Sequence, residues 1–443
     1  MAEHELTEEP RSVESLAQLA DATAELQALG APFSYAASPA ALPAAAFAAM
    51  ESLWRTFAAG VSAFVSSHDG KLAAMAAALR LPEEIAVVAD ALPETGWGVI
   101  GRPDVIVSSG QPRIVDVNVE GLAGLFPLND NLLRTHLAPG LRDEFRQPAM
   151  APRFLMGHYA DILRRFARCD TDLIALTIFA SEVNGDHDFG RWHYELTIRE
   201  LARVGLTADL VFLEDLEITK SGVFAGGRRV GLIHRFFEPR LDDAEELAGV
   251  ARIAAAARDG LVPVFSGLQE LILSNKSTLA VLSDERFTDE LPRSLTGQLE
   301  QVIPWTRILE ERHTRWRGSR IDLLPWAQAN RESLLLKPAL GYWGVDVLAG
   351  RELSPGQWSA LMNSAVAGKE PWVVQEVLKP DEEYAAIFDG QEVRSGRFPV
   401  VYGAYILDNQ FAGAICRYGI RGSRYVMING TVGAVPAPVY WRS

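Results

Sequence analysis

The chain contains little cysteine and no excess of basic charge. Its 443 residues include only Cys169 and Cys416, which cannot form a disulfide framework or a four-thiolate zinc site. The 42 basic and 57 acidic residues give a formal net charge of −15. Proteins that bind the phosphate backbone of nucleic acids need a concentrated basic surface, so we expect no nucleic-acid partner. A bound nucleotide is still compatible with this net charge, because a few local lysines and arginines suffice to bind one.

A long hydrophobic run is also missing. A membrane-spanning helix needs about 20 consecutive apolar residues, and the alanine-rich stretch 39–65 is interrupted by Glu51 and Arg55. The first residues, MAEHELTEEPRSVE, are acidic where a secretory signal would be basic and then apolar. Hydrophobic residues make up 48% of the chain and charged residues 22%, as in ordinary globular proteins. We therefore expect a cytoplasmic protein without membrane contact.

Changes of pattern along the chain indicate several domains, as its length also predicts. Alanine, leucine and phenylalanine recur at helical spacing near the start, which predicts helices over 13–29 and 40–79. LIALTIFAS, a helical stretch and ADLVFLEDL then form a β-α-β pattern. The regions expected are a helical region (1–95), a hairpin with connecting helices (96–165), a βαβ domain (166–260) and a second α/β region (261–443).

RPDVIVSSGQPRIVDVNVEG is predicted to be a hairpin whose strands carry oxygen-bearing side chains. Asp116 and Asn118 alternate along one strand, so they point to one side, and Asp104 lies on the other strand. Carboxylate and amide oxygens of this kind bind Mg²⁺ together with nucleotide phosphates. Arg102, two positions before Asp104, would suit the charge that develops in a phosphoryl or acyl transfer. A solvent-exposed hairpin, in which Asp and Asn occur because they favour turns, is an equally good interpretation.

Two lysines are candidates for binding phosphates. LLLKPALGYWGVDV places Lys337 at the end of a strand, followed by Gly341 and Gly344, so the loop backbone could approach phosphates while the ammonium neutralises them. A βα loop with a surface lysine is the simpler alternative. Lys276 lies in LILSNKSTLAVL, where Ser274 or Asn275 could equally cap a helix.

PWVVQEVL is predicted to be a buried strand that could present backbone groups to an adenine edge. Its candidate residues are Gln375, Glu376 and Val377. Any buried strand end has the same pattern, so this motif is weak by itself. No G-x-G-x-x-G sequence follows the first strand of the βαβ unit, which disfavours a Rossmann dinucleotide site.

In combination and order, these motifs resemble an ATP-grasp ligase. The early metal-type residues and the late phosphate lysine resemble the circularly permuted branch that includes eukaryotic-type glutathione synthetase and glutathionylspermidine synthetase. That branch has R-x-D followed by acid-x-Asn, matched here by Arg102-Pro103-Asp104 and Asp116-Val117-Asn118. The resemblance implies an α/β (α+β) fold: a circularly permuted ATP-grasp core with an inserted βαβ substrate-binding domain and a helical N-terminal region.

The resemblance also implies roles for single residues. Arg102 would act at the reacting centre, while Asp104, Asp116 and Asn118 would bind magnesium. ATP would be bound by the remaining motifs, namely Lys276, Lys337, Gly341, Gly344, Gln375, Glu376 and Val377. Arg235, at the end of a strand of the inserted domain, and Arg417, in a C-terminal hairpin, would bind substrate.

The sequence departs from the family pattern at two places. The acid of acid-x-Asn is Asp116 where the family usually has Glu, which is a conservative change. The loop from Leu340 to Gly344 contains Tyr342 and Trp343 and no acid, so the resemblance does not extend to a third carboxylate ligand there. The substrate loops also differ from the glutathione-specific ones, and we predict no glutathione chemistry.

The function that this resemblance implies is an ATP-dependent carboxylate–amine ligase that uses Mg²⁺ and forms an acyl phosphate. Its substrates would be small amino-acid-like or peptide carboxylates and amines, and its products would include ADP and phosphate. Two alternatives stay open: a nucleotide-binding or scaffold protein without catalysis, and a kinase-like phosphotransferase on the same fold. A homodimer is expected only because it is the commonest oligomer.

Overall fold

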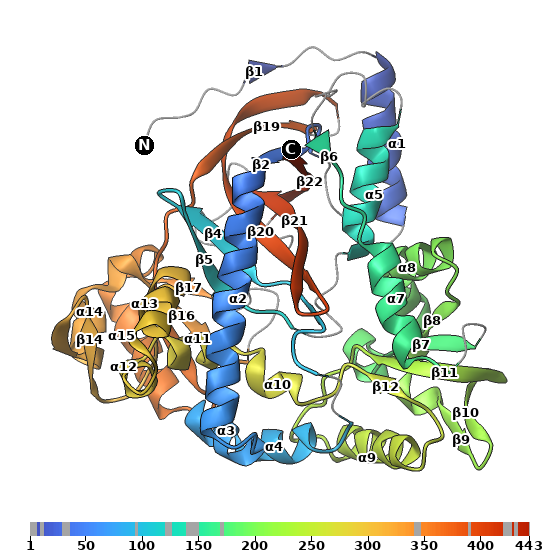
Figure 1. The fold of residues 1–443 in the computed structure, drawn as a ribbon, viewed down its shortest axis with the longest axis horizontal. Coiled ribbons are helices and arrows are strands. Elements are labelled where there is room, and N and C mark those ends of the chain that lie inside the picture. Colours follow the sequence, from blue (N-terminus) through green and yellow to red (C-terminus); the bar gives the residue numbers. More distant parts are fainter. Residues whose placement is uncertain are drawn as a thin grey trace.

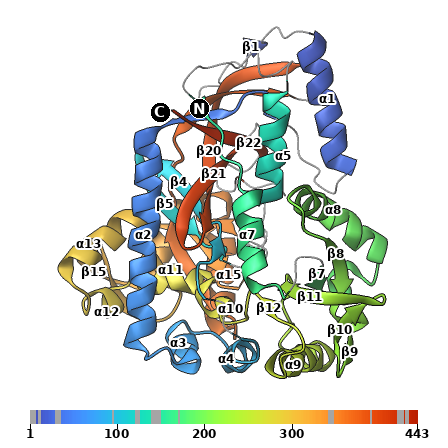
Figure 2. The ribbon, with the colours of Figure 1, turned by 45° about the vertical axis from the view of Figure 1, so that its right-hand side comes forward.

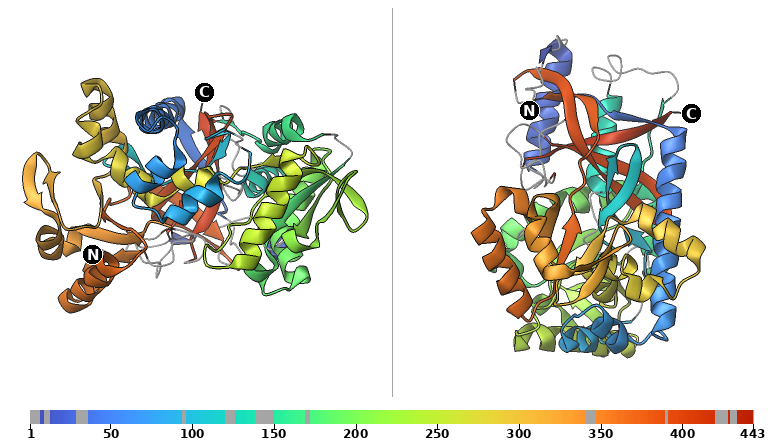
Figure 3. Two further views of the ribbon diagram at one scale, coloured as in Figure 1. Left: turned by 90° about the horizontal axis from the view of Figure 1, so that it is seen from below. Right: turned by 90° about the vertical axis from the view of Figure 1, so that its left-hand side faces the viewer.

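A computed structural model of the chain describes residues 7–8, 13–28, 36–93, 96–119, 126–138, 150–168, 172–340, 347–388, 391–419, 428 and 433–442. A central, mostly antiparallel sheet separates two lobes, which lie on opposite sides of it in Figures 1 and 2. One lobe is built on a parallel sheet, and the other on a small antiparallel sheet covered by short helices. Further views are given in Figure 3.

The central sheet joins strands from the start and the end of the chain. In spatial order they are β2 (Ala40–Pro43), β22 (Val435–Arg442), β21 (Gln410–Tyr418), β20 (Val393–Leu407), β4 (Asp104–Ser108) and β5 (Gln111–Asp116). Shorter segments complete it, of which β1 (Thr7–Glu8), β3 (Ile100–Gly101) and β19 (Glu382–Phe388) pair with β20, and β6 (Met150–Ala151) pairs with β22. Asp408-Asn409, a pair typical of tight hairpin turns, joins β20 to β21 with both residues at positive φ (52° and 58°).

A long helix, α2 (Ala44–Ser67), runs along this sheet (Figure 1). Its apolar face is buried, and the Trp54 ring stacks on Trp97 while its indole N–H donates to the Asn409 carbonyl at 3.1 Å. The helical pattern predicted over 40–79 is wrong at its start. Residues 40–43 form β2, because they pair in parallel with β22, and α2 begins only after Pro43. Left-handed Asp69 and Gly70 separate α2 from the next helix.

The other helices of the N-terminal half are α1 (Val13–Ala28), α3 (Leu72–Ala78), α4 (Glu83–Ala89) and α5 (Phe126–Leu137).

The parallel-sheet lobe confirms the predicted β-α-β unit. β7 (Leu173–Ile178), α8 (His187–Arg203) and β8 (Ala208–Phe212) follow one another, and β7 pairs in parallel with β8. The strand order is β8-β7-β11-β12, with β11 at Arg228–Arg235 and β12 at Val264–Phe265. The lobe is completed by β9 (Glu217–Thr219), β10 (Gly222–Ala225), α7 (Met156–Phe166) and α9 (Ala244–Arg258).

The second lobe is built on four strands in the order β13 (Thr306–Ile308), β18 (Trp372–Glu376), β16 (Leu334–Pro338) and β17 (Leu348–Ala349). Around them lie α10 (Glu270–Leu273), α11 (Lys276–Leu282), α12 (Glu285–Thr288), α13 (Arg293–Val302), α14 (Leu323–Ala329), α15 (Pro355–Ala367) and the hairpin β14 (His313–Trp316)–β15 (Ser319–Asp322). Ser354-Pro355 is typical of a helix start, and in α15 Ser354 and Gln357 form a reciprocal capping box with Pro355 at the first position.

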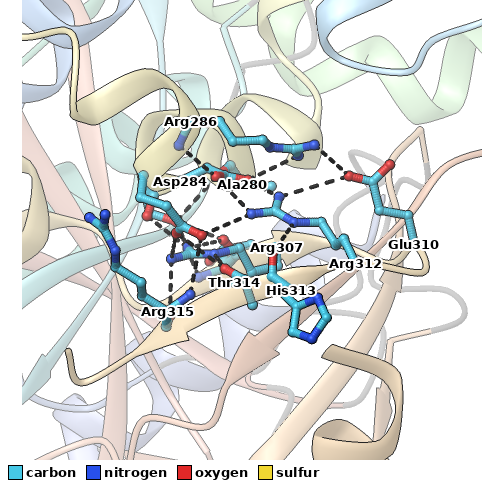
Figure 4. A network of polar contacts seen from close by, with 12 residues as sticks. Ala280, Asp284, Arg286, Arg307, Glu310, Arg312, His313, Thr314 and Arg315 are labelled. Atoms are coloured by element: carbon cyan, nitrogen blue, oxygen red, sulfur yellow. Dashed lines mark hydrogen bonds and ion pairs between the residues drawn. The ribbon is translucent and has the colours of Figure 1, made fainter. Parts of the chain in front are cut away.

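A largely buried ionic network holds the β14–β15 hairpin to this lobe (Figure 4). Arg307 on β13 donates to Glu285 at 2.9 Å and to Thr314 of β14 at 2.7 Å, and Arg312 pairs with Asp284. Burial alone would raise the pKa of Asp284, but its hydrogen bonds and the neighbouring arginines lower it to about 2. A two-stranded hairpin is only marginally stable in isolation, so these contacts fix its place.

Within the described ranges, no helix is both long and apolar enough to cross a membrane. The boundaries drawn between the four sequence regions stay predictions.

Candidate active site

The β4–β5 hairpin brings the predicted metal-type residues together. Its turn is Ser109-Gly110, both at positive φ, and the Asp381 carboxylate accepts their two N–H groups at 2.8 Å each. Asp104 and Asp116 are direct cross-strand partners, next to a bulge between Asp104 and Val105. Cross-strand partners lie side by side on one face of a sheet, so the two carboxylates share one location.

Asp104 is the common partner of two buried arginines. Its Oδ1 lies 2.6 Å from Nη2 of Arg417, on β21, and 3.8 Å from Nε of Arg102. Burial opposes ionisation of Asp104, but the charges of Arg417 and Arg102 outweigh it and hold the pKa of this carboxyl below its usual range. Burial likewise lowers the pKa of Arg102, against the attraction of Asp104. The chain thus holds two fixed positive charges and one negative charge at the centre of the site.

Hydrogen bonds with Asn118 hold the backbone of Arg102, and the neighbouring strand β20 packs against its side chain. Its N–H donates to the Asn118 carbonyl at 2.6 Å, and the Asn118 side-chain amide donates to the Arg102 carbonyl at 3.1 Å. On the neighbouring strand β20, a β-carbon added at Gly403 would lie 2.9 Å from Cδ of Arg102. Glycine is therefore required there to leave room for the arginine side chain.

Lys276 approaches the hairpin from the second lobe. It is the first residue of α11, after Asn275, whose side chain caps the helix by accepting the Ser277 N–H at 3.0 Å. Both sequence interpretations are therefore compatible, since Asn275 caps the helix and Lys276 reaches the site. Its Nζ lies 3.9 Å from Oδ1 of Asp116.

Lys337, on β16, is buried beside the same hairpin. Its Nζ donates to Oε1 of Gln375 at 2.7 Å and to the Val115 carbonyl at 3.1 Å. Burial lowers the pKa of Lys337 to about 8, although nearby Asp116 opposes the shift. Lys337 is therefore not a surface lysine of a βα loop, which was the simpler interpretation of its sequence.

The strand predicted to face an adenine ring is central in its sheet. β18 pairs with β13 on one side and β16 on the other. The N–H of Glu376 donates to the Trp305 carbonyl, and that of Val377 to the Ser333 carbonyl, both at 2.9 Å. These two N–H groups are engaged within the protein, and the contact of Gln375, Glu376 and Val377 with adenine stays a prediction.

The remaining predicted residues lie elsewhere or outside the described ranges. Arg235 is buried at the end of β11 and binds protein groups, among them the carbonyls of Ser266 and Phe237. Its role as a substrate ligand stays a prediction. Gly341 and Gly344 fall outside the described residues, as does most of the segment 420–431 that follows Arg417.

Sequence reasoning missed a contact that joins the hairpin to the second lobe. Arg113 of β5 pairs with the Glu376 carboxylate at 3.1 Å, which also accepts the Trp305 N–H at 3.0 Å. Arg113 carries no motif, because its partner is 263 positions away in sequence. The alternation of β5 alone could have shown only that Arg113 lies on one face of the hairpin.

The donor set fits a magnesium–nucleotide complex. In proteins Mg²⁺ usually takes one or two carboxylates and completes its shell with phosphates and water. Asp116 is about one-third exposed and lies between two lysines, while Asp104 is already neutralised by arginines. In the part of the chain that the structure describes, no group of three or more His, Cys, Asp or Glu residues could hold a metal. A magnesium ion here would therefore depend on phosphate oxygens, with Asp116, Asn118 and Asp104 as protein ligands.

The fold was compared with known proteins. A glutathione synthetase-like effector from Globodera pallida, solved in its apo form, superposes with a TM-score of 0.61 over 98% of both chains at 12% identity. The chain therefore has the fold of this glutathione synthetase-like protein. The predicted fold class is thereby confirmed, while the circular permutation stays a prediction.

Two other solved structures are similar to this chain at a lower level. A putative γ-glutamylcysteine synthetase from Methylobacillus flagellatus has a TM-score of 0.41 and 11% identity over 83% of this chain and 87% of its own. The ATP-grasp ligase PsnB, complexed with a minimal precursor, has a TM-score of 0.25 and 9% identity over 61% and 90%. No protein-family model and no curated protein matches the chain.

Proposed function

We propose that the chain is an ATP-dependent carboxylate–amine ligase that releases ADP and phosphate. The observation that carries this proposal is the convergence of two lysines on an acid-bearing hairpin, beside a buried Arg102–Asp104–Arg417 group. The lysines would bind the phosphates, the hairpin oxygens would bind magnesium, and a fixed cation would bind the carboxylate substrate. The glutathione synthetase-like fold is compatible with this arrangement.

In this proposal MgATP binds between the hairpin and the strands β16 and β18. Lys337 would exchange its bonds to Gln375 and Val115 for a phosphate oxygen, and Lys276 would leave Asp116 for another. Bound magnesium would neutralise charge on the phosphates. Arg417 would hold the carboxylate substrate, since its guanidinium is buried and restrained by Asp104.

The chemistry proceeds in two balanced transfers. A carboxylate oxygen of the substrate attacks the γ-phosphorus, the bond to the β–γ bridging oxygen breaks, and ADP leaves. The amine nitrogen then attacks the acyl carbon, the bond from that carbon to the phosphate oxygen breaks, and the departing phosphate takes the proton that the nitrogen loses. Arg102 stabilises the negative oxygen of the tetrahedral stage, because it is held at a fixed place before reaction.

The proposal is tested by an ADP-release screen of amino acids and polyamines, with mass spectrometry of the products. Arg102→Ala should lower the rate of ADP release roughly 100-fold, as loss of a preorganised oxyanion donor does, and Asp116→Ala should lower it at least about tenfold. Lys71→Met is a matched control, because Lys71 is exposed and pairs with nearby Asp69 at 3.1 Å. Undiminished turnover in both site variants would contradict the assignment.

Nucleotide binding without turnover is the second candidate. It is favoured by the sequence of the glycine loop, where Tyr342 and Trp343 leave no acid for a further metal ligand. This candidate predicts ATP binding with no ADP release across the whole panel. A kinase-like phosphotransferase would instead give a stable phosphorylated product and no amide. The same mass spectra therefore separate all three functions.

A further inference from the structure

An eleven-residue segment connects the parallel-sheet lobe to the candidate phosphate lysine. We call residues 266–276 the connector. It leaves β12 after Phe265, passes through α10 and ends at Lys276, the first residue of α11. Nearly all of its side chains are buried, including Glu270, Asn275 and Lys276. A buried segment with this many polar groups needs hydrogen-bond partners for most of them, so its path is closely determined.

Arg235 fixes the start of the connector. Its Nε donates to the Ser266 carbonyl at 2.6 Å, and its Nη2 donates to Ser266 Oγ at 3.2 Å and to the Gly267 carbonyl at 3.3 Å. The Ser266 hydroxyl in turn donates to Glu270 at 2.8 Å, and Glu270 lies 3.6 Å from Arg235. These four residues form a closed buried group.

The backbone at this point is strained. Ser266 has a φ of +69°, in the left-handed region that residues with a side chain avoid. A β-carbon added at Gly267 would lie 2.6 Å from the Pro93 carbonyl oxygen, so the connector packs closely against the backbone at Pro93. Such a conformation persists only where surrounding contacts impose it, and the contacts to Ser266 come from Arg235 and Glu270.

The far end of the connector reaches two parts of the candidate site. The Ser274 hydroxyl donates to the carbonyl of Val119, next to Asn118, at 2.7 Å. The Lys276 N–H donates to the carbonyl of Ala339, two residues after Lys337, at 3.1 Å. A shift of the connector would therefore displace Lys276 relative to the hairpin and to β16.

We propose that Arg235 is a positioning residue, which holds Ser266 and Gly267 so that the connector places Lys276 against the nucleotide. This inference rests on the proposed nucleotide site. Arg235 ends β11, beside β7 in the order β8-β7-β11-β12. Ligands of parallel sheets bind at the carboxyl ends of the strands where the strand order reverses, here between β7 and β11. The connector thus runs from that edge to the phosphate lysine.

The test compares binding of a non-hydrolysable ATP analogue with magnesium by isothermal titration calorimetry. Arg235→Lys keeps the charge but loses the fork that reaches Ser266 and Gly267, and should weaken binding about tenfold or more, because small misplacements of a binding group are costly. In a Lys276→Met background the same change should add little, since Arg235 acts through Lys276. Equal losses in both backgrounds would overturn the proposal.

Two further variants separate positioning from stability. Ser266→Ala and Ser266→Gly both remove the hydroxyl that bridges Arg235 and Glu270, and both should weaken nucleotide binding similarly. Glycine tolerates the positive φ, so Ser266→Gly should have the higher melting temperature. Tyr159→Phe is the matched control. It removes the 2.5 Å bond to His234, the neighbour of Arg235 on β11, without touching the connector. Affinities that followed the melting temperature in all of these variants would contradict the proposal.

A measurement without nucleotide distinguishes failure of this inference from failure of the proposed function. In Arg235→Lys, hydrogen–deuterium exchange should rise in peptides covering 266–280 and 116–119, and stay unchanged in β8. If the wild type binds no nucleotide, the proposed function fails, yet the exchange data still test the connector. Unchanged exchange in 266–280 would overturn the positioning role of Arg235.

Discussion

At the scale of single residues, Lys337 is the group whose chemistry the fold alters most directly. Its Nζ is buried against Gln375 and Val115, and burial lowers its pKa from 10.5 to about 8. A base whose folded-state pKa is lowered binds fewer protons in the folded than in the unfolded protein between these two values. Its contribution therefore disfavours folding below pH 8 and disappears as the pH rises above 10.5.

This gives a prediction for Lys337→Met. As the pH rises from about 8 to 10, the unfolding free energy of the wild type should increase relative to that of the variant by up to about 1.4 kcal/mol per pH unit. Chemical denaturation of both proteins at several pH values measures the difference, and Lys71→Met serves as the exposed-lysine control. A difference that stays flat across this range would show that Lys337 is fully charged in the folded protein. The variant should also lose nucleotide affinity, so stability and function would change in opposite directions at neutral pH.

Residue-level prediction from sequence succeeded for residues joined by a short motif. Arg102, Asp104, Asp116 and Asn118 lie within one hairpin, where alternation along strands determines their side, and the structure brings them together. The pairing of Asp104 with Arg417 was not predicted, because it depends on β4 and β21 meeting through β20. Their predicted roles in binding and catalysis remain to be tested by the variants above.

At the scale of elements, the Asp284 network determines how the β14–β15 hairpin is attached. A folded pKa of about 2 for Asp284, against 3.8 ordinarily, means that its ionised form stabilises the fold at neutral pH. That contribution is complete above about pH 4 and is lost as the pH falls toward 2. From the shift alone it amounts to roughly 2 kcal/mol.

Asp284→Asn should therefore lower the unfolding free energy by about 2 kcal/mol at pH 7, because Arg312 loses one of its carboxylate partners while Glu285 still pairs with both Arg312 and Arg307. The deficit should shrink as the pH falls below 4. Urea titrations at pH 7 and pH 3.5 measure it. Asp289→Asn provides a control, because Asp289 pairs with Arg315 of the same hairpin and this pair is exposed and contributes little. Equal effects of the two changes would contradict the role of the network.

Elements were predicted well where local pattern and environment agree. The continuous apolar run of β7, the Asp408-Asn409 turn and the capping box of α15 each carry their own signal. β2 was missed because AALP is an alanine-rich stretch with helical composition, and only pairing with β22, nearly 400 positions away, makes it a strand. Short strands such as β13 were missed for the same reason, since their partners are distant.

At the scale of the whole molecule, the candidate site exists only because the central sheet meets the second lobe. The β4–β5 hairpin and β21 of the central sheet supply the acids and Arg417, and β16 and α11 of the second lobe supply the lysines. The order of motifs along the chain was enough to predict an ATP-grasp fold. It was not enough to predict the connector, because the contacts of Arg235 join segments about 30 residues apart that share no pattern.

The most direct test of the account is calorimetric titration of the wild type with a non-hydrolysable ATP analogue and magnesium. We predict one site per chain, with affinity at least about tenfold weaker in Lys276→Met and in Lys337→Met, and dependent on magnesium in the wild type but much less so in Asp116→Asn. Lys71→Met should bind like the wild type. Absence of binding to the wild type, or an affinity in both site-lysine variants equal to that of the wild type, would contradict the nucleotide site on which the account depends.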